Sequence, residues 1–430
     1  MTERIVVPLR RARRPSPALT RLALSVLATL VAAVMLGTST ACDNKIIDAG
    51  GDSTGTLTSL ALRVEGRGDV PDRYTAEVWV VGNIAYTTTW GARTLNGARS
   101  FGNAVKIWNI AGATPILVDS LIVSDAITLG DIQATDDGKL LIVATEFAPG
   151  SIAVYDLANP VKPQLVSRFK STNTIPGVHT AEVQRVNGKL FAFLCVDPGG
   201  GQPAKLVIVD LSNPAAPVEV FAQAMGAPYV HDVFVRDGIL MTALWNDGVS
   251  IFDIGGGGKG GTVASPVLLG NAKTVGGKVH NIWWLHDAAN GTKRYAFIGE
   301  EGPGTIGSAS VGDIHVVDVS NLADPHEVAF YNVPSAGTHN FSVDEDRGVL
   351  FAAYYNAGVR ALNVRGDLGR CDAGMKSEDG RCDLGKMGRE LGHALTDTGI
   401  SVYVWGVQSV GTKVYASDML NGLWRIETVQ

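Results

Sequence analysis

The sequence predicts an all-β protein, a seven-bladed β-propeller of four-stranded antiparallel blades. Its 430 residues include 51 glycines, 46% hydrophobic residues and only 18% charged residues, which indicates a large core with many tight turns. A sequence unit recurs at intervals of about 43 to 65 residues without helical periodicity, as in propellers and other repeat proteins. The last unit is one strand short, and a spare strand precedes the first.

Each unit begins with two apolar strands joined by a turn, often Asn-Gly or Asp-Gly, whose residues supply the positive φ values of a two-residue hairpin. A third strand follows and ends in Asp or Asn, as in KLVIVDLSNPAAP over residues 205–217. A fourth strand comes after the proline. Four short strands in a unit of this length make a propeller blade. Seven units are found, with six or eight blades as the alternatives.

The Asp or Asn that ends the third strand is expected to be structural. Its side chain can accept hydrogen bonds from nearby backbone N–H groups, and Asn-Pro then starts a turn because proline fixes φ. These residues are Asn109, Asp156, Asp210, Asp253, Asp318 and Asn363. After Asp253 the Asn-Pro is replaced by the glycine-rich segment 255–261, which we expect to be a flexible loop.

The VIVD-type strands resemble those of the LVIVD-repeat family of extracytoplasmic β-propellers. The close copies are those around Asp156, Asp210 and Asp318, and the resemblance covers residues 57–430. It implies a single propeller domain over this range. Because the seventh unit stops just after its third strand, we expect the spare strand at 57–66 to complete the last blade, so that no sheet edge is left open.

The first 41 residues differ from the rest of the chain. Six arginines precede a 16-residue apolar run from Leu22 to Gly37, which is followed by small residues and Cys42, an order typical of an export signal. An uncleaved membrane anchor is the alternative, for which the run is short. The tetrapeptide STAC at 39–42 resembles the lipobox of bacterial lipoproteins, which implies lipidation of Cys42; ordinary cleavage nearby is the alternative. Residues 42–56 are expected to form a flexible tether.

We therefore expect a periplasmic or cell-surface protein that is anchored to a membrane by lipid. Removal of residues 1–41 leaves 30 basic and 41 acidic residues and a net charge of −11. Such an acidic chain disfavours nucleic acid as a partner, because phosphates need a basic surface. A monomer that binds a protein or a small molecule at one propeller face is expected.

Three cysteines follow Cys42. Cys195 lies in the apolar run LFAFLCV and is expected to be a buried small hydrophobe. Cys371 and Cys382 flank a polar loop within an insertion at 365–390, and in an oxidising compartment they predict a disulfide. A metal site at this pair is the alternative, although neither cysteine has a CxxC neighbour.

The repeat register aligns four of the eight histidines. The residue that opens the inner strand is, from the first unit to the seventh, Tyr74, Gly130, His179, His231, His280, His339 and Trp405. Inner strands surround the propeller axis, so we expect these side chains to cluster at one mouth of the channel. Imidazole suits transition metals such as Fe, Cu and Zn, which makes the four histidines candidate metal ligands. The alternative is structural: each histidine bonds the backbone of the preceding turn.

A second set of side chains is expected at the same mouth, since in an antiparallel blade the second strand ends where the first begins. These residues are Glu146, Asp197, Asp247, Glu300 and Asp418. Their carboxylates could supply metal ligands or acid–base groups. Solvated acidic loops are the alternative.

The sequence thus favours a binding or interaction module. The alternative is a metal-dependent enzyme, an oxidoreductase or a hydrolase, with its site among the histidines. A propeller fold by itself does not decide between these functions.

Overall fold

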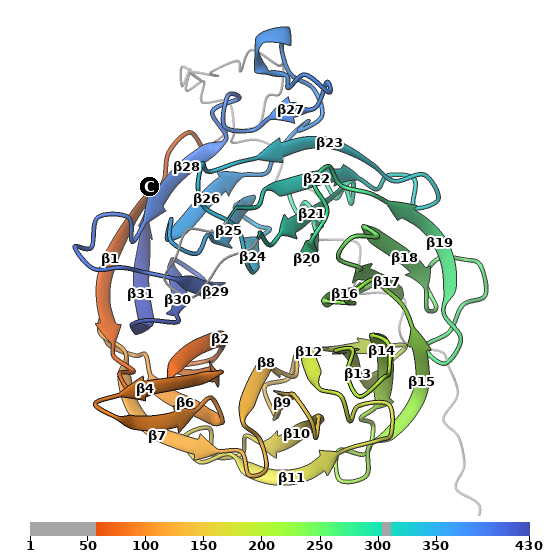
Figure 1. Cartoon of the computed structure of the whole chain (residues 1–430). Helices are drawn as coiled ribbons and strands as arrows, with labels where there is room; N and C mark the ends of the chain where they lie inside the picture. Colours follow the sequence, from red (N-terminus) through yellow and green to blue (C-terminus); the bar gives the residue numbers. More distant parts are fainter. Residues whose placement is uncertain (1–56, 303–310) are drawn as a thin grey trace, which may run out of the picture. The chain divides into compact units, whose positions relative to one another are not determined.

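The computed structural model describes residues 57–302 and 311–430; the expected signal peptide, Cys42 and the tether lie outside this part of the chain. Seven sheets, each with four antiparallel strands, stand around a central axis (Figure 1). The seven-bladed propeller predicted from the repeats is therefore confirmed. Among the described residues, no helix is long and apolar enough to cross a membrane.

The first three blades follow one another along the chain, and the strands of each run in sequence order from the axis outward. Blade 1 contains β2 (Tyr74–Val81), β3 (Ile84–Trp90), β6 (Ala104–Asn109) and β7 (Ile116–Ile122). A hairpin leaves this blade between β3 and β6, formed by β4 (Ala92–Leu95) and β5 (Ala98–Phe101). Blade 2 contains β8 (Thr128–Ala134), β9 (Leu140–Glu146), β10 (Ser151–Asp156) and β11 (Gln164–Phe169). Blade 3 contains β12 (Val178–Val186), β13 (Lys189–Val196), β14 (Lys205–Asp210) and β15 (Val218–Ala224).

The next three blades repeat this order. Blade 4 contains β16 (Asp232–Arg236), β17 (Ile239–Ala243), β18 (Val249–Asp253) and β19 (Val267–Ala272). Blade 5 contains β20 (Val279–Trp284), β21 (Tyr295–Glu300), β22 (Ile314–Asp318) and β23 (His326–Tyr331). Blade 6 contains β24 (Phe341–Asp344), β25 (Val349–Ala353), β26 (Val359–Asn363) and β28 (Glu390–Ala394).

The insertion between β26 and β28 folds back onto blade 5. Its short strand β27 (Cys382–Asp383) pairs in parallel with β23, after one turn of 3-10 helix at Ala373–Met375. Cys371 and Cys382 are joined by a disulfide in this segment. Cys195, by contrast, is a free cysteine with no exposed surface, inside β13.

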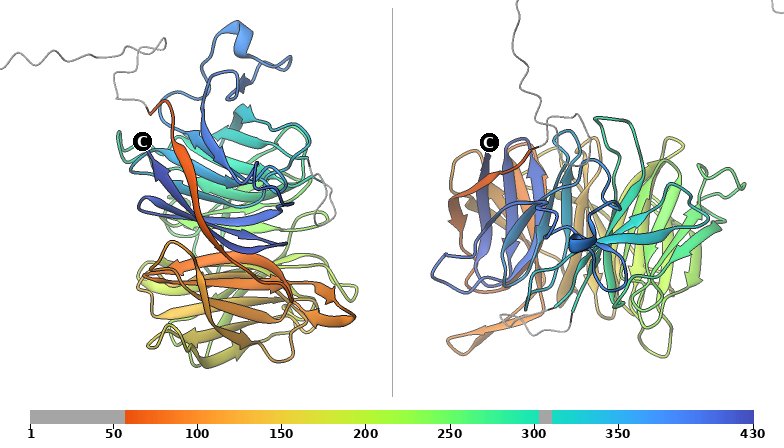
Figure 2. Two further views of the ribbon diagram at one scale, coloured as in Figure 1. Left: turned by 90° about the vertical axis from the view of Figure 1, so that its left-hand side faces the viewer. Right: turned by 90° about the horizontal axis from the view of Figure 1, so that it is seen from above.

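Blade 7 joins the two ends of the described chain. It contains β29 (Val404–Val410), β30 (Lys413–Asp418) and β31 (Gly422–Val429), and its outermost strand is the N-terminal β1 (Ala61–Gly68). β1 runs antiparallel to β31, with Ala61 opposite Val429 and Gly68 opposite Leu423 (Figure 2). The ring is therefore closed by the strand that the sequence left over, as predicted.

The core lies between the faces of neighbouring blades. The third strand of blade 3 shows this: the four residues from Leu206 to Val209 are fully buried, because both faces of the sheet pack against other blades. Continuous apolar runs are typical of strands that are covered on both faces. The outermost strand is different, and most of β7 is exposed.

The side-chain oxygen of the Asp or Asn at the end of the third strand accepts a hydrogen bond from the backbone N–H of the residue two positions further on. This bond measures 2.7–3.0 Å in six blades, for Asn109, Asp156, Asp210, Asp253, Asp318 and Asn363. The Asn of Asn-Pro or Asn-Leu repeats the arrangement three residues later in blades 2, 3 and 5. Two successive turns of this kind explain the sequence pattern Asp-x-x-Asn.

The glycine-rich segment after Asp253 is organised rather than loose. The buried Asp253 carboxylate accepts four backbone N–H groups, from Gly255 and Gly257 on Oδ1 and from residues 259 and 261 on Oδ2, at 2.7–3.1 Å. A Cβ on Gly261 would lie 2.0 Å from the carbonyl oxygen of Asp253. Glycine is therefore needed for the backbone to wrap around the carboxylate, and the expectation of a flexible loop was wrong.

Candidate functional site

A β-bulge near the start of the inner strand aims one side chain at the axis. In blade 3, Val178 pairs with Val196 and Thr180 with Cys195, which leaves His179 without a partner in the register. His280 in blade 5 and Trp405 in blade 7 are left out of the pairing in the same way. A bulge inserts one extra residue and re-aims its side chain, so the backbone itself sets these positions.

Blades 4 and 6 place their histidines just before the inner strand. The backbone N–H groups of His231 and His339 each donate to the second strand at 2.8 Å, to the carbonyl oxygens of Ala243 and Ala353. All four histidines line the central channel together with Trp405. The structure thus brings the four candidate ligands to one place, as the register predicted.

The five aromatic side chains form a continuous arc. Ring centroids of successive members lie 4.3, 4.1, 4.0 and 4.1 Å apart, in the order His179, His231, His280, His339 and Trp405. Each member comes from the blade after the previous one. His280 and His339 are only 2% and 3% exposed. The imidazoles contact one another instead of turning back onto separate blade loops.

Trp90 and Glu146 complete the arc to a ring of seven side chains, one from each blade. Trp90 packs against Trp405 at 6.0 Å and donates its indole N–H to Oε2 of Glu146. Oε1 of Glu146 accepts the Nδ1–H of His179. Both residues end the second strand of their blade, not the first. We call this closed set the axial ring.

Sequence reasoning assigned Tyr74 and Gly130 to these two positions. Tyr74 instead packs beside Trp90 under the guanidinium of Arg93, 5.1 Å from the ring centroid. At Gly130, a Cβ would lie 2.0 Å from the carbonyl oxygen of His179 and 3.3 Å from Cγ of Glu146. The missing side chain therefore lets the backbone of His179 approach closely and leaves space for Glu146. A glycine where other units have histidine is the feature of the sequence that could have indicated this difference.

The histidines of the axial ring divide by charge. Burial alone would lower the pKa of His179, but the carboxylates of Glu146 and Asp197 outweigh it and raise the pKa to about 10. Burial and the neighbouring imidazoles hold the pKa of His231 and of His280 well below the usual range, and burial does the same for His339. At neutral pH the ring thus contains one imidazolium and three neutral imidazoles.

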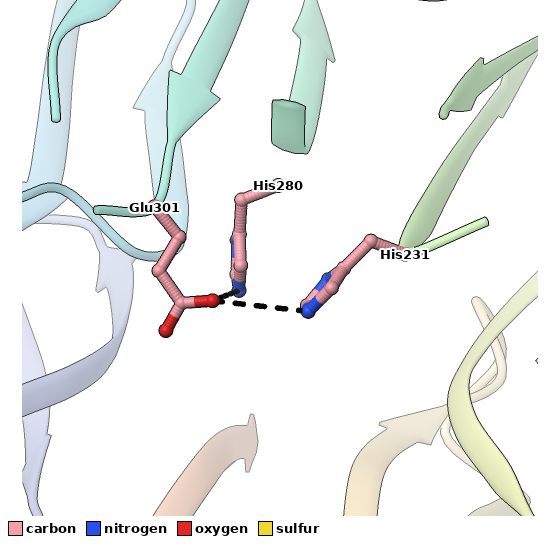
Figure 3. Close-up of side chains that lie close together, drawn as sticks. All are labelled: His231, His280 and Glu301. Carbon is pink, nitrogen blue, oxygen red and sulfur yellow. Dashed lines mark ion pairs between the residues drawn. The ribbon is translucent and has the colours of Figure 1, made fainter. Parts of the chain in front are cut away.

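Glu301, not Glu300, reaches the axial ring. Its Oε2 lies 3.9 Å from Nε2 of His231 and 3.9 Å from Nε2 of His280 (Figure 3). Its Oε1 accepts the O–H of Tyr355. Glu300 ends β21 and points the other way, toward the buried His315, whose Nε2 is 3.2 Å from Oε2. The sequence shows two consecutive glutamates, Glu300 and Glu301, at the end of this strand, but it does not say which of them faces the axis.

The other expected carboxylates lie in different surroundings. Asp197 is near the ring, with Oδ2 3.9 Å from Nδ1 of His179. Asp418 is fully buried and accepts four hydrogen bonds within blade 7, so it is a structural residue. Asp247 is half-buried in the turn after β17, and its backbone N–H donates to Leu244. Of the five carboxylates, only Glu146 and Asp197 adjoin a ring histidine.

Two groups, each made of axial-ring residues and one neighbouring carboxylate, have metal-ligand geometry. One consists of His231, His280 and Glu301, and the other of Glu146, His179 and Asp197; within each group the ligand atoms lie within 4.8 Å of one another. The first group has nitrogen atoms that are free to bind a metal ion, since neither nitrogen of His280 has a hydrogen-bond partner among the described residues. In the second, Nδ1 of His179 is already engaged by Glu146.

Beside the ring the channel wall is acidic. The channel contains a cavity of about 830 Å³, and its wall includes Glu77, Asp131, Glu182 and Asp232 from the inner strands of blades 1 to 4. Burial and the nearby Asp131 raise the pKa of Asp232 to about 8 and that of Glu77 well above its usual range. Asn340 donates to Oε1 of Glu77 at 2.7 Å. Carboxyl groups that are held protonated in this way can both donate and accept hydrogen bonds, which suits a polar ligand.

Two segments of the chain match a known repeat. Residues 200–223, in blade 3, and 309–333, in blade 5, match the LVIVD repeat. Both segments include the third and fourth strands of their blade with the Asp-x-x-Asn turn between them. No curated protein matches the chain significantly.

Fold and site together define the class: a seven-bladed β-propeller with a ring of seven side chains around its axis. The chain is a seven-bladed β-propeller that carries two LVIVD repeats, one in blade 3 and one in blade 5. This fold supports a role as a binding or interaction module, because a propeller presents a preformed central pocket to a ligand.

Proposed function

We propose that this protein is an exported, lipid-anchored binding module that holds its ligand at the axial ring. The observation that supports this most strongly is a set of buried nitrogens without a hydrogen-bond partner among the described residues: Nδ1 of His231, Nδ1 and Nε2 of His280, and Nδ1 of His339. Buried polar groups are normally satisfied by protein, water or ligand. A ligand in the channel mouth would satisfy these nitrogens.

Native mass spectrometry of the full-length protein purified from its own host tests the axial site. We expect a bound species in the wild type that is lost in the double variant His231→Gln/His280→Gln. The matched control is Asn271→Ala, on the outer strand of blade 4, which should keep the bound species. A bare protein mass in the wild type would contradict the proposal.

The export and anchoring proposal is supported by the sequence of residues 1–42, with basic, apolar and small segments before Cys42. The test is metabolic labelling with an alkyne fatty acid in a bacterial expression host. We expect label on the wild type in the membrane fraction and none on Cys42→Ser. An unlabelled wild type would show ordinary cleavage or an uncleaved anchor.

We further propose that the protein is a monomer and does not bind nucleic acid. Sedimentation velocity of the protein alone measures its oligomeric state, and sedimentation with duplex DNA shows whether a complex forms.

A metal-dependent enzyme at the same mouth is the second candidate. One observation favours it: the Tyr355 hydroxyl is hydrogen-bonded to Glu301, which gives a proton-carrying group beside two imidazoles. The test is turnover of p-nitrophenyl acetate, and of hydrogen peroxide with a phenolic reductant, by protein loaded with zinc, iron or copper. Turnover that disappears in Tyr355→Phe supports an enzyme. No turnover leaves the binding module.

A further inference from the structure

We propose that His231, His280 and Glu301 form a binding site for one divalent first-row transition-metal ion. The inference rests on the proposed axial ligand site and names its chemistry. Blade 4 supplies one imidazole, and blade 5 supplies the other imidazole and the carboxylate (Figure 3).

The distances between the three ligand atoms are the first observation that supports the site. Oε2 of Glu301 lies 3.9 Å from Nε2 of each histidine, which is too long for a hydrogen bond. Metal–nitrogen and metal–oxygen bonds are each about 2.0–2.2 Å, so two ligands at a tetrahedral angle are about 3.4 Å apart, and a shift of about 0.5 Å in these side chains gives that separation. The gap between these atoms therefore fits an ion and does not fit a direct contact.

The nitrogens of His280, which lack hydrogen-bond partners, are the second observation that supports the site. His280 is 2% exposed, and neither of its nitrogens has a hydrogen-bond partner among the described residues. A buried imidazole without partners loses the free energy of hydration that it had in the unfolded chain. Coordination of Nε2 to a metal ion would offset that loss.

The orientation of the Glu301 carboxylate is the third observation that supports the site. Tyr355, from blade 6, donates its O–H to Oε1 and leaves Oε2 directed at the two histidines. Hydrogen bonds of this kind orient metal-binding carboxylates. Three protein donors leave open coordination positions toward the channel, as in sites that bind an exchangeable ligand.

The neighbouring group of Glu146, His179 and Asp197 is not the proposed site. Nδ1 of His179 donates a hydrogen bond to Glu146, so the nitrogen nearest the carboxylates is already occupied. Glu146 also accepts from Trp90. This group closes the axial ring.

Calorimetric titration of Zn²⁺ and Co²⁺ into chelator-treated full-length protein tests the proposal. We expect one ion per chain, and a visible Co²⁺ absorption band from nitrogen and oxygen ligands. Glu301→Gln should weaken binding by about 100-fold or more, since even outer-shell partners of metal ligands change affinity 10- to 100-fold. Glu219→Gln, the same substitution on the outer strand β15 of blade 3, should leave affinity within threefold. Glu146→Gln reports on the neighbouring group.

Each outcome decides the question. No binding to the wild type, or loss in Glu146→Gln with retention in Glu301→Gln, would overturn the site. His231→Gln takes the place of Glu301→Gln if circular dichroism shows that the latter does not fold. An organic ligand in native mass spectrometry without any bound cation would overturn the metal site and leave the axial binding function intact.

Discussion

The imidazoles of His280 and His339 lie in contact with their centroids 4.0 Å apart and their planes tilted by 53°, and Nδ1 of each has no hydrogen-bond partner among the described residues. Two adjacent buried rings with unsatisfied nitrogens lower the stability of the ligand-free protein, because each desolvated polar group costs about 1–3 kcal/mol. Residues that are kept at the expense of stability are typical of functional sites.

We therefore predict that His280→Leu stabilises the metal-free protein. Leucine has a similar volume and brings no polar atom, so the free energy of unfolding should rise by about 1 kcal/mol. Urea denaturation in the presence of a chelator measures this. His179→Leu is the matched control and should destabilise, because it removes the partner of the Glu146 carboxylate. Destabilisation by His280→Leu of more than about 1 kcal/mol would show that ordered water satisfies its nitrogens.

The sequence could predict the four histidines because they occupy one register position of a repeated blade. It could not predict Trp90 or Glu301. Trp90 comes from the end of the second strand, and the inner strand of blade 1 has a bulge between Thr75 and Val78. Bulges depend on tertiary packing and have no short sequence signature here.

Ring closure, by contrast, followed from counting strands. The seventh unit has only three strands, and one strand without a partner precedes the first unit. Pairing β1 with β31 completes the last blade and leaves no strand unpaired. What counting could not show is the role of Asp253. The carboxylate holds a glycine-rich loop through four N–H groups, a three-dimensional arrangement that composition alone reads as flexibility.

We predict that Asp253→Ala destabilises the protein much more than Asp210→Ala. Asp253 is 1% exposed and loses four N–H partners, whereas Asp210 interacts only with Ser212, whose backbone N–H is 2.7 Å away. Expected losses are about 3 and about 1 kcal/mol, since net hydrogen bonds to charged groups are worth about 1.5–3 kcal/mol and the freed loop regains hydration. Chemical denaturation measures both; equal losses would mean that the loop does not depend on the carboxylate.

A pH effect follows from His315, which is fully buried between Glu327 and Glu300, with Arg381 beside Glu327. Burial alone would lower the pKa of His315, but the two carboxylates outweigh it and raise the pKa to about 9. The unfolded value is about 6.5. The folded state thus gains stability from His315 that is complete below pH 6.5 and is lost as pH rises toward 9.

The size of this effect is about 3 kcal/mol, at 1.36 kcal/mol for each unit of pKa difference. His179 titrates with the same sign, so the informative quantity is the difference between wild type and His315→Gln. The free energy of unfolding of the variant should fall less steeply between pH 6.5 and 9. Parallel curves for the two proteins over that range would contradict the assigned charge.

Closure of the ring depends on the close approach of Gly68 to blade 1. A Cβ at this residue would lie 2.3 Å from Cζ3 of the buried Trp108 and 2.7 Å from the carbonyl oxygen of Pro115. Gly68→Ala should therefore push this end of β1 away from blade 1 and cost about 2 kcal/mol, within the range for overpacked cores. Gly112→Ala is the matched control, since no atom lies within 4 Å of its added Cβ. Thermal unfolding compares the two variants, and size-exclusion chromatography shows whether an opened blade 7 exposes its edge and associates; similar melting temperatures for both would show that β1 tolerates the shift.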